Sequence, residues 1–250
     1  MQTQYWNEYS PSLGRNMEVK RYGHAGRPVL FIPCQNGRFF DFENFHMTDA
    51  WQRFIDSGDC VVYSTDVIDQ ETWSDTEGDP VWRINRHESW FHFLTDELAP
   101  FIRSDVNRLN GWDGYPGIIA FGCSLGALHA TNLFLRRPDL FDGLLALSGI
   151  YTASYGFGSF MNEQVYLNSP VDFLGGMDPS HPYAERYRNG RGIIVVGTGP
   201  WEMPESTFRL KELSEEKNLG LWVDIWGSDS AHDWDWWYRQ VDYHVPHLLY

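Results

Sequence analysis

Residues 116–128 read Pro116-Gly117-Ile118-Ile119-Ala120-Phe121-Gly122-Cys123-Ser124-Leu125-Gly126-Ala127-Leu128, and this stretch decides the fold. The apolar run 118–121 predicts a buried strand, and a helical pattern follows over 127–137. Between them lies a G-x-S-x-G sequence, the pattern of a serine held on a strained turn from a strand into a helix. Glycines on both sides of Ser124 let the strand and the helix approach each other closely. We therefore expect the Ser124 hydroxyl to stand clear of the backbone as a nucleophile.

The segments around this stretch alternate between strands and helices. An antiparallel pair is expected at 4–10 and 16–22, further strands at 28–33, 60–64, 144–147, 192–196 and 219–226, and helices at 42–55, 87–106, 205–217 and 233–249. The later strands are continuous apolar runs, which predict a mostly parallel sheet covered by helices on both faces. We expect a single α/β domain over 1–250, with an irregular segment at 65–85 and a lid-like or cap insertion at 151–189.

Composition restricts the classes of partner. The formal charge of −15 argues against binding to nucleic-acid phosphates and against docking to anionic membranes. The cysteines are odd in number and lack metal-ligand spacing, so we expect a reducing, cytoplasmic setting and no metal. The N-terminus has no signal-peptide pattern, and no apolar run approaches the ~20 residues of a membrane span. A homo-oligomer is left open.

A serine nucleophile needs a base, and the base needs an orienting acid, in the chain order serine, acid, histidine. The chain has 9 histidines. Among those that come after Ser124, only His232 directly follows a predicted strand, the one at 219–226. We expect His232 to be the base. The remaining histidines either precede Ser124 or lie on the 127–137 helix, in the insertion or in the terminal segment: His24, His46, His87, His92, His129, His181, His244 and His247.

The acid is expected in the loop after the 192–196 strand. Glu202 is the only carboxylate there before the helix that begins at Glu205, so it is our candidate. Glu205 is a rival that also suits the positive end of a helix dipole, and Asp224 and Asp229 are further rivals on the strand and loop of the histidine.

An oxyanion hole needs two backbone N–H groups. One is expected from Leu125, directly after the nucleophile, and the other from the loop after the 28–33 strand, with Gln35 preferred to Asn36. Asn36, Arg38 and Trp201 are candidate substrate contacts. Arg38 also fits a plain surface arginine, and Trp73, Trp82 and Trp201 fit either a substrate pocket or core packing.

Four pieces of the chain resemble the putative-esterase family of α/β-hydrolases, which includes S-formylglutathione hydrolases, enterochelin esterases and mycolyltransferase antigens. They are residues 122–127, residues 197–202, the aromatic-rich segment 231–237 and residues 39–45. The resemblance implies an α/β-hydrolase fold, acyl-ester chemistry, and a triad of Ser124, Glu202 and His232. The loop 34–38 departs from the usual form of the family, which leaves the second oxyanion donor open.

The expected function is hydrolysis of small-molecule carboxylic esters through an acyl-enzyme on Ser124, with no cofactor. Two alternatives remain at this stage. The same triad serves an acyltransferase or a peptidase, and a hydrolase scaffold can also serve as a non-catalytic binding protein. Cys123 is expected to be a small buried residue that points into the sheet.

Overall fold

The computed structural model describes residues 1–114 and 117–250, so Pro116, which opens the 116–128 stretch, lies outside the described part. Within the described residues, eight strands form one sheet in the order β1-β2-β4-β3-β5-β6-β7-β8. The strands are β1 (Thr3–Ser10), β2 (Arg15–Tyr22), β3 (Arg27–Ile32), β4 (Cys60–Thr65), β5 (Ile118–Cys123), β6 (Phe141–Leu147), β7 (Arg191–Val196) and β8 (Trp222–Ile225).

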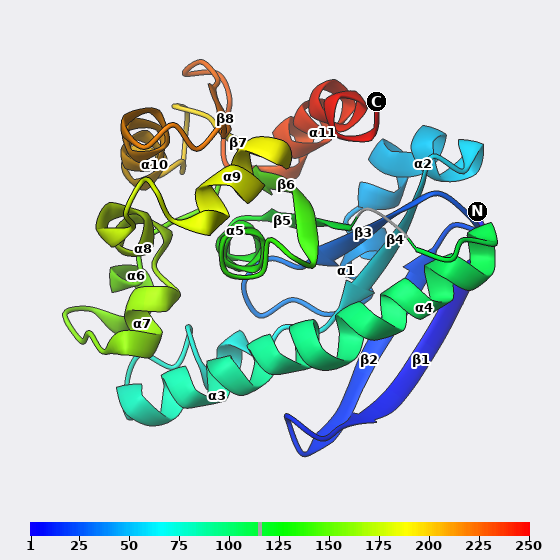
Figure 1. Ribbon diagram of the computed structural model, residues 1–250, viewed down its shortest axis with the longest axis horizontal. Coiled ribbons are helices and arrows are strands. Elements are labelled where there is room, and N and C mark those ends of the chain that lie inside the picture. The colour runs from blue at the N-terminus through cyan, green and yellow to red at the C-terminus, as the bar shows by residue number, and fades with distance from the viewer. Residues whose placement is uncertain (115–116) are drawn as a thin grey trace.

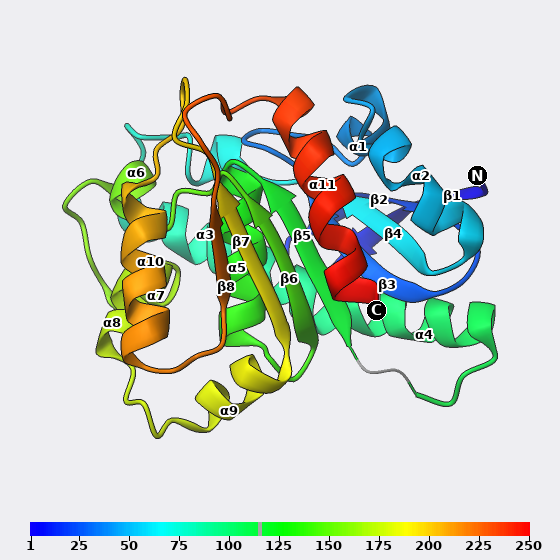
Figure 2. The same ribbon diagram turned by 90° about the horizontal axis from the view of Figure 1, so that it is seen from above.

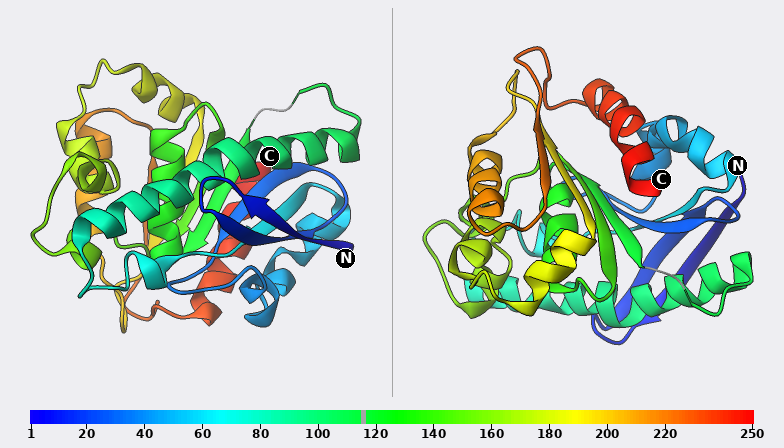
Figure 3. Two further views of the ribbon diagram at one scale, coloured as in Figure 1. Left: turned by 90° about the horizontal axis from the view of Figure 1, so that it is seen from below. Right: turned by 45° about the horizontal axis from the view of Figure 1, so that its top comes forward.

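The pairing of these strands makes the sheet mostly parallel. β1 pairs antiparallel with β2, and β2 pairs antiparallel with β4. Every other neighbouring pair is parallel. The hairpin of β1 and β2 lies at one outer edge of the sheet, where it follows the sheet's twist (Figure 3). The predicted α/β fold is confirmed.

Helices cover both faces of the sheet. They are α1 (Asp41–Asn44), α2 (Met47–Ser57), α3 (Pro80–His92), α4 (Ala99–Asn110), α5 (Leu125–Arg136), α6 (Ser154–Phe157), α7 (Glu163–Leu167), α8 (Pro170–Gly176), α9 (Pro182–Asn189), α10 (Glu205–Glu216) and α11 (Trp234–Leu249). Two irregular helical turns, η1 (Asp69–Glu71) and η2 (Phe93–Leu98), complete the set. Helices α2 and α11 lie on one face, and α5 with the long α3–α4 rod lies on the other (Figures 1 and 2).

Side chains of the buried strands alternate between two hydrophobic cores. On β5, Ile118 and Ala120 pack toward α3, α4 and α5, whereas Ile119 and Phe121 pack toward α2 and α11. All six residues of β5 are buried, as expected for a central parallel strand that is covered on both faces. The continuous apolar runs in the sequence arise from these two cores.

Two predicted helix boundaries are wrong. The expected 42–55 helix is broken into α1 and α2, because His46 adopts a left-handed conformation with φ 55° between them. The irregular 65–85 segment already becomes helical at Pro80, where the Asp79 side chain caps the helix by accepting from the Trp82 N–H. The expected 87–106 helix is therefore the middle of a longer rod.

The structure adds detail at Pro100 and in the 151–189 segment that the periodicity of the sequence did not show. Pro100 is accommodated in the first turn of α4, directly after the π-helical turn η2, so the rod continues past it. The 151–189 segment, which has no clean period in sequence, contains the four short helices α6, α7, α8 and α9. Each helix is too short to show a repeating apolar stripe.

Candidate active site

The turn from β5 into α5 holds Ser124 in a strained backbone conformation. Its φ is 57° and its ψ is −127°, a region that residues with a Cβ rarely occupy. The flanking glycines permit this turn: a Cβ on Gly122 would lie 2.2 Å from the Gly126 carbonyl oxygen, and one on Gly126 would lie 2.3 Å from the Ile32 carbonyl oxygen. The local sequence thus forms a nucleophile elbow.

His232 lies beside this serine. Its Nε2 is 3.0 Å from Ser124 Oγ, within hydrogen-bond reach. The loop after β8 carries the histidine, and its backbone N–H donates to the Pro200 carbonyl of the neighbouring loop at 3.0 Å. The edge of the imidazole packs against the buried Trp237 ring, with centroids 5.1 Å apart. The side chain is 22% exposed, so solvent can reach the pair.

Glu202 lies on the far side of the imidazole. Its Oε2 is 3.5 Å from His232 Nδ1 and has no hydrogen-bond partner in residues 1–114 and 117–250. The other oxygen, Oε1, accepts from Ser148 Oγ at 2.7 Å and from the Gly197 N–H at 3.1 Å. The carboxylate is only 1% exposed. One oxygen is therefore anchored and the other is left for the histidine.

The rival acids have other environments. Asp224 Oδ2 accepts from the Trp226 indole at 2.9 Å and lies 3.0 Å from His244 Nε2. Asp229 and Glu205 are exposed. Of the four candidate acids, the structure brings Glu202 to His232.

The two expected oxyanion donors are free of other partners among the described residues. Leu125 is the first residue of α5, where backbone N–H groups have no partner inside the helix. The Gln35 N–H likewise has no partner in the described chain. The Asn36 N–H, in contrast, donates to Asp69 Oδ2 at 3.1 Å. This contact separates the alternatives that the sequence left open, since only Gln35 of the two has a free N–H to offer.

The side chains of the loop after β3, which carries Gln35 and Asn36, are held by their surroundings. Gln35 Nε2 donates to Ser74 Oγ at 2.7 Å, and Gln35 Oε1 accepts from the Tyr155 hydroxyl at 2.9 Å. Ser74 Oγ in turn donates to Asn36 Oδ1 at 2.9 Å. The loop is thereby linked both to the segment after β4 and to the 151–189 insertion.

Arg38 lies between two carboxylates. Its guanidinium donates to Asp66 Oδ1 at 2.9 Å and to Glu18 Oε2. The hydrogen bond to Asp66 is the largest influence on the pKa of Arg38 and raises it above its ordinary value, although partial burial acts in the opposite direction. The charge of Arg38 is therefore already matched within the protein.

Trp201 projects from the loop that carries Glu202. It is 87% exposed, and its φ of 67° is a left-handed conformation that bulky side chains rarely adopt. Trp82 is also exposed, whereas Trp73 is buried and donates to His87 Nδ1 at 3.2 Å. Trp73 is thus a core residue, and Trp201 is an exposed side chain next to Glu202 in the chain.

The described residues contain no group of three or more His, Cys, Asp or Glu side chains arranged to hold a metal ion. Burial raises the pKa of the Cys123 thiol well above its ordinary value, and the side chain is fully buried, as expected for a small core residue. Within residues 1–114 and 117–250, no helix has the length and apolarity that crossing a bilayer requires.

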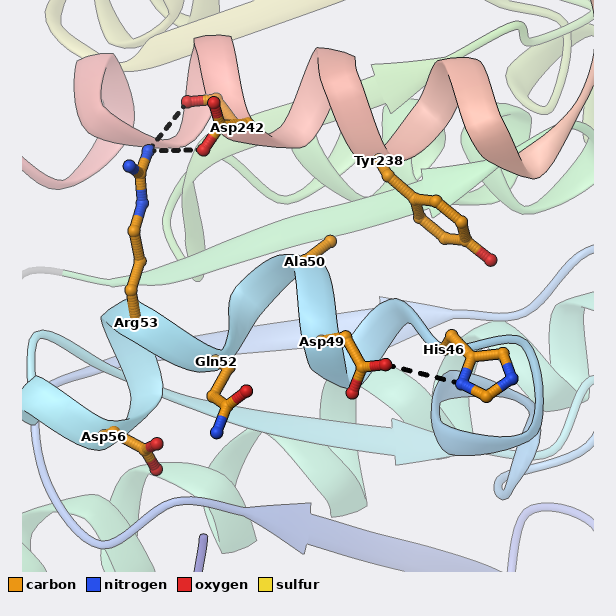
Figure 4. A pocket seen from close by; sticks show the side chains of 8 residues that line it. All are labelled: His46, Asp49, Ala50, Gln52, Arg53, Asp56, Tyr238 and Asp242. Carbon is orange, nitrogen blue, oxygen red and sulfur yellow. Dashed lines mark hydrogen bonds and ion pairs between the residues drawn. The ribbon is translucent and has the colours of Figure 1, made fainter.

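A separate pocket of about 580 Å³ lies between α2 and α11 (Figure 4). The Arg53 guanidinium bridges the two helices across it, 2.8 Å from Asp242 Oδ1. The residues that line it do not include Ser124, Glu202 or His232: they are His46, Asp49, Ala50, Gln52, Arg53, Asp56, Tyr238 and Asp242. This pocket is therefore distinct from the serine site.

Two residues of the site were not identified from sequence. Ser148 follows β6 and holds Glu202, and Asp69 in η1 holds the Asn36 N–H. Ser148 directly follows a predicted strand, which is the position where site residues gather in parallel sheets, so this signal was available. Asp69 is one of several acids in an irregular segment, and nothing in the sequence distinguishes it from its neighbours.

The fold and the serine turn define an α/β-hydrolase. The chain belongs to the Putative esterase family, whose profile matches residues 10–248. It is 28% identical over 159 residues to diacylglycerol acyltransferase/mycolyltransferase Ag85A of Mycobacterium leprae (strain TN). That alignment covers 62% of this chain and 46% of the relative, so it spans less than half of the relative's length.

Solved structures share the fold at low sequence identity. A ferulic acid esterase matches with a TM-score of 0.74 and 16% identity over 99% of this chain and 98% of that one. An S-formylglutathione hydrolase from Agrobacterium tumefaciens matches with a TM-score of 0.72 and 14% identity over 99% and 94%. At this identity the structures support the fold. With the family, they support a hydrolase that acts on esters in general.

Proposed function

We propose that this protein is a serine carboxylic-ester hydrolase that works through an acyl-enzyme on Ser124. The observation that carries the proposal is the series Ser124 Oγ, His232 Nε2, His232 Nδ1 and Glu202 Oε2, with separations of 3.0 Å and 3.5 Å at its two junctions. A hydroxyl within reach of an imidazole, and an imidazole beside a buried carboxylate, is the arrangement that activates a serine.

In the first half of the reaction, His232 takes the proton of Ser124 as Oγ attacks the ester carbonyl. The negative charge that develops on the carbonyl oxygen is stabilised by the N–H groups of Leu125 and Gln35. Glu202 orients the ring and stabilises the imidazolium that forms. The attraction between the two charges shortens the 3.5 Å separation between His232 Nδ1 and Glu202 Oε2. The carbon–oxygen bond to the alcohol then breaks, and the alcohol leaves with the proton from His232.

In the second half, water takes the place of the alcohol. His232 removes a proton from the water as its oxygen attacks the acyl carbonyl. The bond to Ser124 breaks, the proton returns to Oγ, and the carboxylic acid leaves. Ser124 and His232 thus return to their starting protonation states, and the cycle consumes only the ester and one water.

Candidate substrate contacts lie around this centre. We propose that the exposed Trp201 indole covers an apolar part of the substrate and that the Asn36 side chain contacts its polar part. A role for Arg38 as the partner of a substrate carboxylate is the weaker proposal, because Asp66 and Glu18 already neutralise it. We also propose that the 151–189 segment forms part of a cap, supported by the hydrogen bond from Tyr155 to Gln35.

The test is hydrolysis of p-nitrophenyl acetate together with labelling by a fluorophosphonate. We expect Ser124→Ala to abolish labelling and to lower kcat by about four orders of magnitude or more. Ser104→Ala, an exposed serine on α4, is the matched control and should leave both unchanged. A fully active Ser124→Ala variant would refute the proposal.

Acyl transfer to an alcohol is a second candidate, favoured by the Ag85A relative. It uses the same acyl-enzyme, with an alcohol in place of water in the second half. Product analysis with added alcohols distinguishes the two: ester products at low alcohol concentration indicate a transferase, and free acid alone indicates a hydrolase. The three unpaired cysteines support a reducing, cytoplasmic setting for either activity.

A further inference from the structure

The Asp69 carboxylate contacts both parts of the chain that carry oxyanion donors. Its Oδ2 accepts from the Asn36 N–H at 3.1 Å, on the loop that presents Gln35. Its Oδ1 lies 3.0 Å from His129 Nε2 on α5, the helix that begins with Leu125. Asp69 is only 2% exposed, so these contacts are made away from water.

The contact with Asn36 governs the orientation of the peptide beside Gln35. Asn36 has a φ of 60°, a left-handed conformation that asparagine adopts more readily than most other residues with a Cβ. The hydrogen bond to Asp69 fixes the peptide between Gln35 and Asn36. It therefore restricts rotation of Gln35 and with it the direction of the Gln35 N–H.

The contact with His129 ties the same carboxylate to the elbow helix. His129 lies one turn after Leu125 and therefore on the same face of α5. Its ring is packed among Trp73, Trp90 and His87, with centroids between 5.1 and 5.7 Å away. Its Nδ1 is buried without a hydrogen-bond partner among the described residues, so the polar contact of the ring there is the one that Nε2 makes with Asp69.

The backbone of Asp69 is held as firmly as its side chain. Its carbonyl accepts from the Thr72 N–H at 2.9 Å and from the Ser74 N–H at 2.8 Å. The carboxylate is thus a rigid bridge between the loop after β3 and helix α5. Its hydrogen bonds within residues 1–114 and 117–250 involve no member of the proposed triad.

We propose that Asp69 is a positioning residue for the oxyanion hole: it sets the distance between the N–H groups of Gln35 and Leu125 through Asn36 and His129. This inference rests on the proposed function, because an oxyanion forms only if Ser124 attacks a carbonyl. The predicted consequence is specific: loss of the bridge weakens stabilisation of the oxyanion and leaves the triad intact.

The test combines two measurements: hydrolysis of p-nitrophenyl acetate, and inhibition by a trifluoromethyl ketone. A catalytic serine attacks the carbonyl of such a ketone and gives a hemiketal oxyanion. Active sites are counted by fluorophosphonate titration, so that misfolded protein does not enter the rates. We expect Asp69→Ala to raise the inhibition constant of the ketone and to lower kcat/KM by the same factor, about ten-fold or more, chiefly through kcat. Complete removal of one donor costs about 10²–10³-fold, so a misaligned donor should cost less.

Three further variants make the test specific. Asp69→Asn can still accept from the Asn36 N–H through its amide oxygen and can donate to His129 Nε2 through its amide nitrogen, so it should restore most of the activity. Asp69→Ser, which is too short to span both partners, replaces Asp69→Ala if that variant does not fold. Asp105→Ala, which removes a buried carboxylate bound to Arg21 and Tyr63, should lower stability and leave the inhibition constant unchanged.

Each outcome has one meaning. An unchanged inhibition constant in folded Asp69→Ala or Asp69→Ser, or an Asp69→Asn variant as impaired as alanine, overturns the positioning role alone. A wild-type protein that neither labels nor hydrolyses contradicts the proposed function and this inference with it. Parallel losses in inhibitor affinity and kcat/KM, with rescue by asparagine, support both.

Discussion

At the scale of single residues, the environment of Glu202 supports its proposed role as the acid beside His232. Ser148 donates its only hydroxyl proton to Glu202 Oε1 and accepts from the Trp237 indole at 2.9 Å. The hydroxyl is therefore fully oriented, and Ser148 itself has a left-handed φ of 52°. The histidine-facing oxygen of Glu202 is held in place through these contacts, which makes Ser148 a support for the proposed acid.

We predict that Ser148→Ala lowers kcat by roughly ten-fold, because a hydrogen bond to a buried charge is worth about 1.5–3 kcal/mol. The matched control is Ser64→Ala, a buried serine on β4 whose hydroxyl has no hydrogen-bond partner among the described residues, and it should leave kcat unchanged. Steady-state hydrolysis of p-nitrophenyl acetate measures both. An unchanged kcat in Ser148→Ala, or an equal loss in Ser64→Ala, would contradict this role.

At the scale of elements, the contact between β5, α5 and β3 depends on missing side chains. Gly126 sits in the first turn of α5 directly against the Ile32 and Pro33 carbonyls of the β3 end. Backbone atoms of a central strand cannot move aside as a side-chain tip can. The absence of a Cβ at Gly126 therefore sets the distance between the Ser124 turn and the loop after β3.

We predict that Gly126→Ala lowers the free energy of unfolding by about 2–3 kcal/mol or more, since the new methyl overlaps backbone in a packed core. Gly175→Ala is the matched control, because a methyl on this helical glycine would meet no atom of the described residues within 4 Å. It should be neutral or stabilising by up to about 1 kcal/mol. Urea unfolding of both variants measures the difference, and equal stabilities would contradict the packing argument.

At the scale of the whole molecule, a buried ion cluster joins the antiparallel edge of the sheet to the α3–α4 rod. Asp105 on α4 accepts from Arg21 on β2 at 2.7 Å and from the Tyr63 hydroxyl on β4 at 2.8 Å. Burial acts to raise the pKa of Asp105, but hydrogen bonds from Arg21, Arg108 and Tyr63 outweigh it and leave the pKa below its ordinary value.

A carboxyl whose pKa is lowered by folding stabilises the protein above its unfolded pKa, and this contribution is lost as pH falls through the folded pKa. We predict that Asp105→Asn is less stable than wild type at pH 7, and that the gap begins to narrow as pH falls below about 4, the ordinary pKa of an aspartate. The free energy of unfolding in urea, measured at about pH 7, 5 and 3.5, tests this prediction. A gap that stays constant with pH would show that the charge of Asp105 does not carry the effect.

Much of the fold followed from patterns that depend on neighbours in the chain. The apolar runs predicted the buried strands, and the glycines beside Ser124 predicted the tight turn. Both predictions were possible because strand burial and tight turns depend on residues close together in the chain. The break at His46 and the helix start at Pro80 were missed. Both depend on how a short segment meets the rest of the protein, which periodicity does not contain.

By itself, the sequence determined the α/β fold, the serine turn and the order in which Ser124, Glu202 and His232 follow one another. Parallel strands bring their carboxyl ends to one edge of the sheet. Because Ser124, Glu202 and His232 each follow such a strand, their positions in the chain were enough to predict that they lie close together. Only the tertiary structure decided that Gln35 rather than Asn36 has a free N–H, that Arg38 is already paired, and that Ser148 and Asp69 support the site. The reason is physical: each of these points depends on a contact between residues distant in the chain, and side-chain identity alone does not specify its partner.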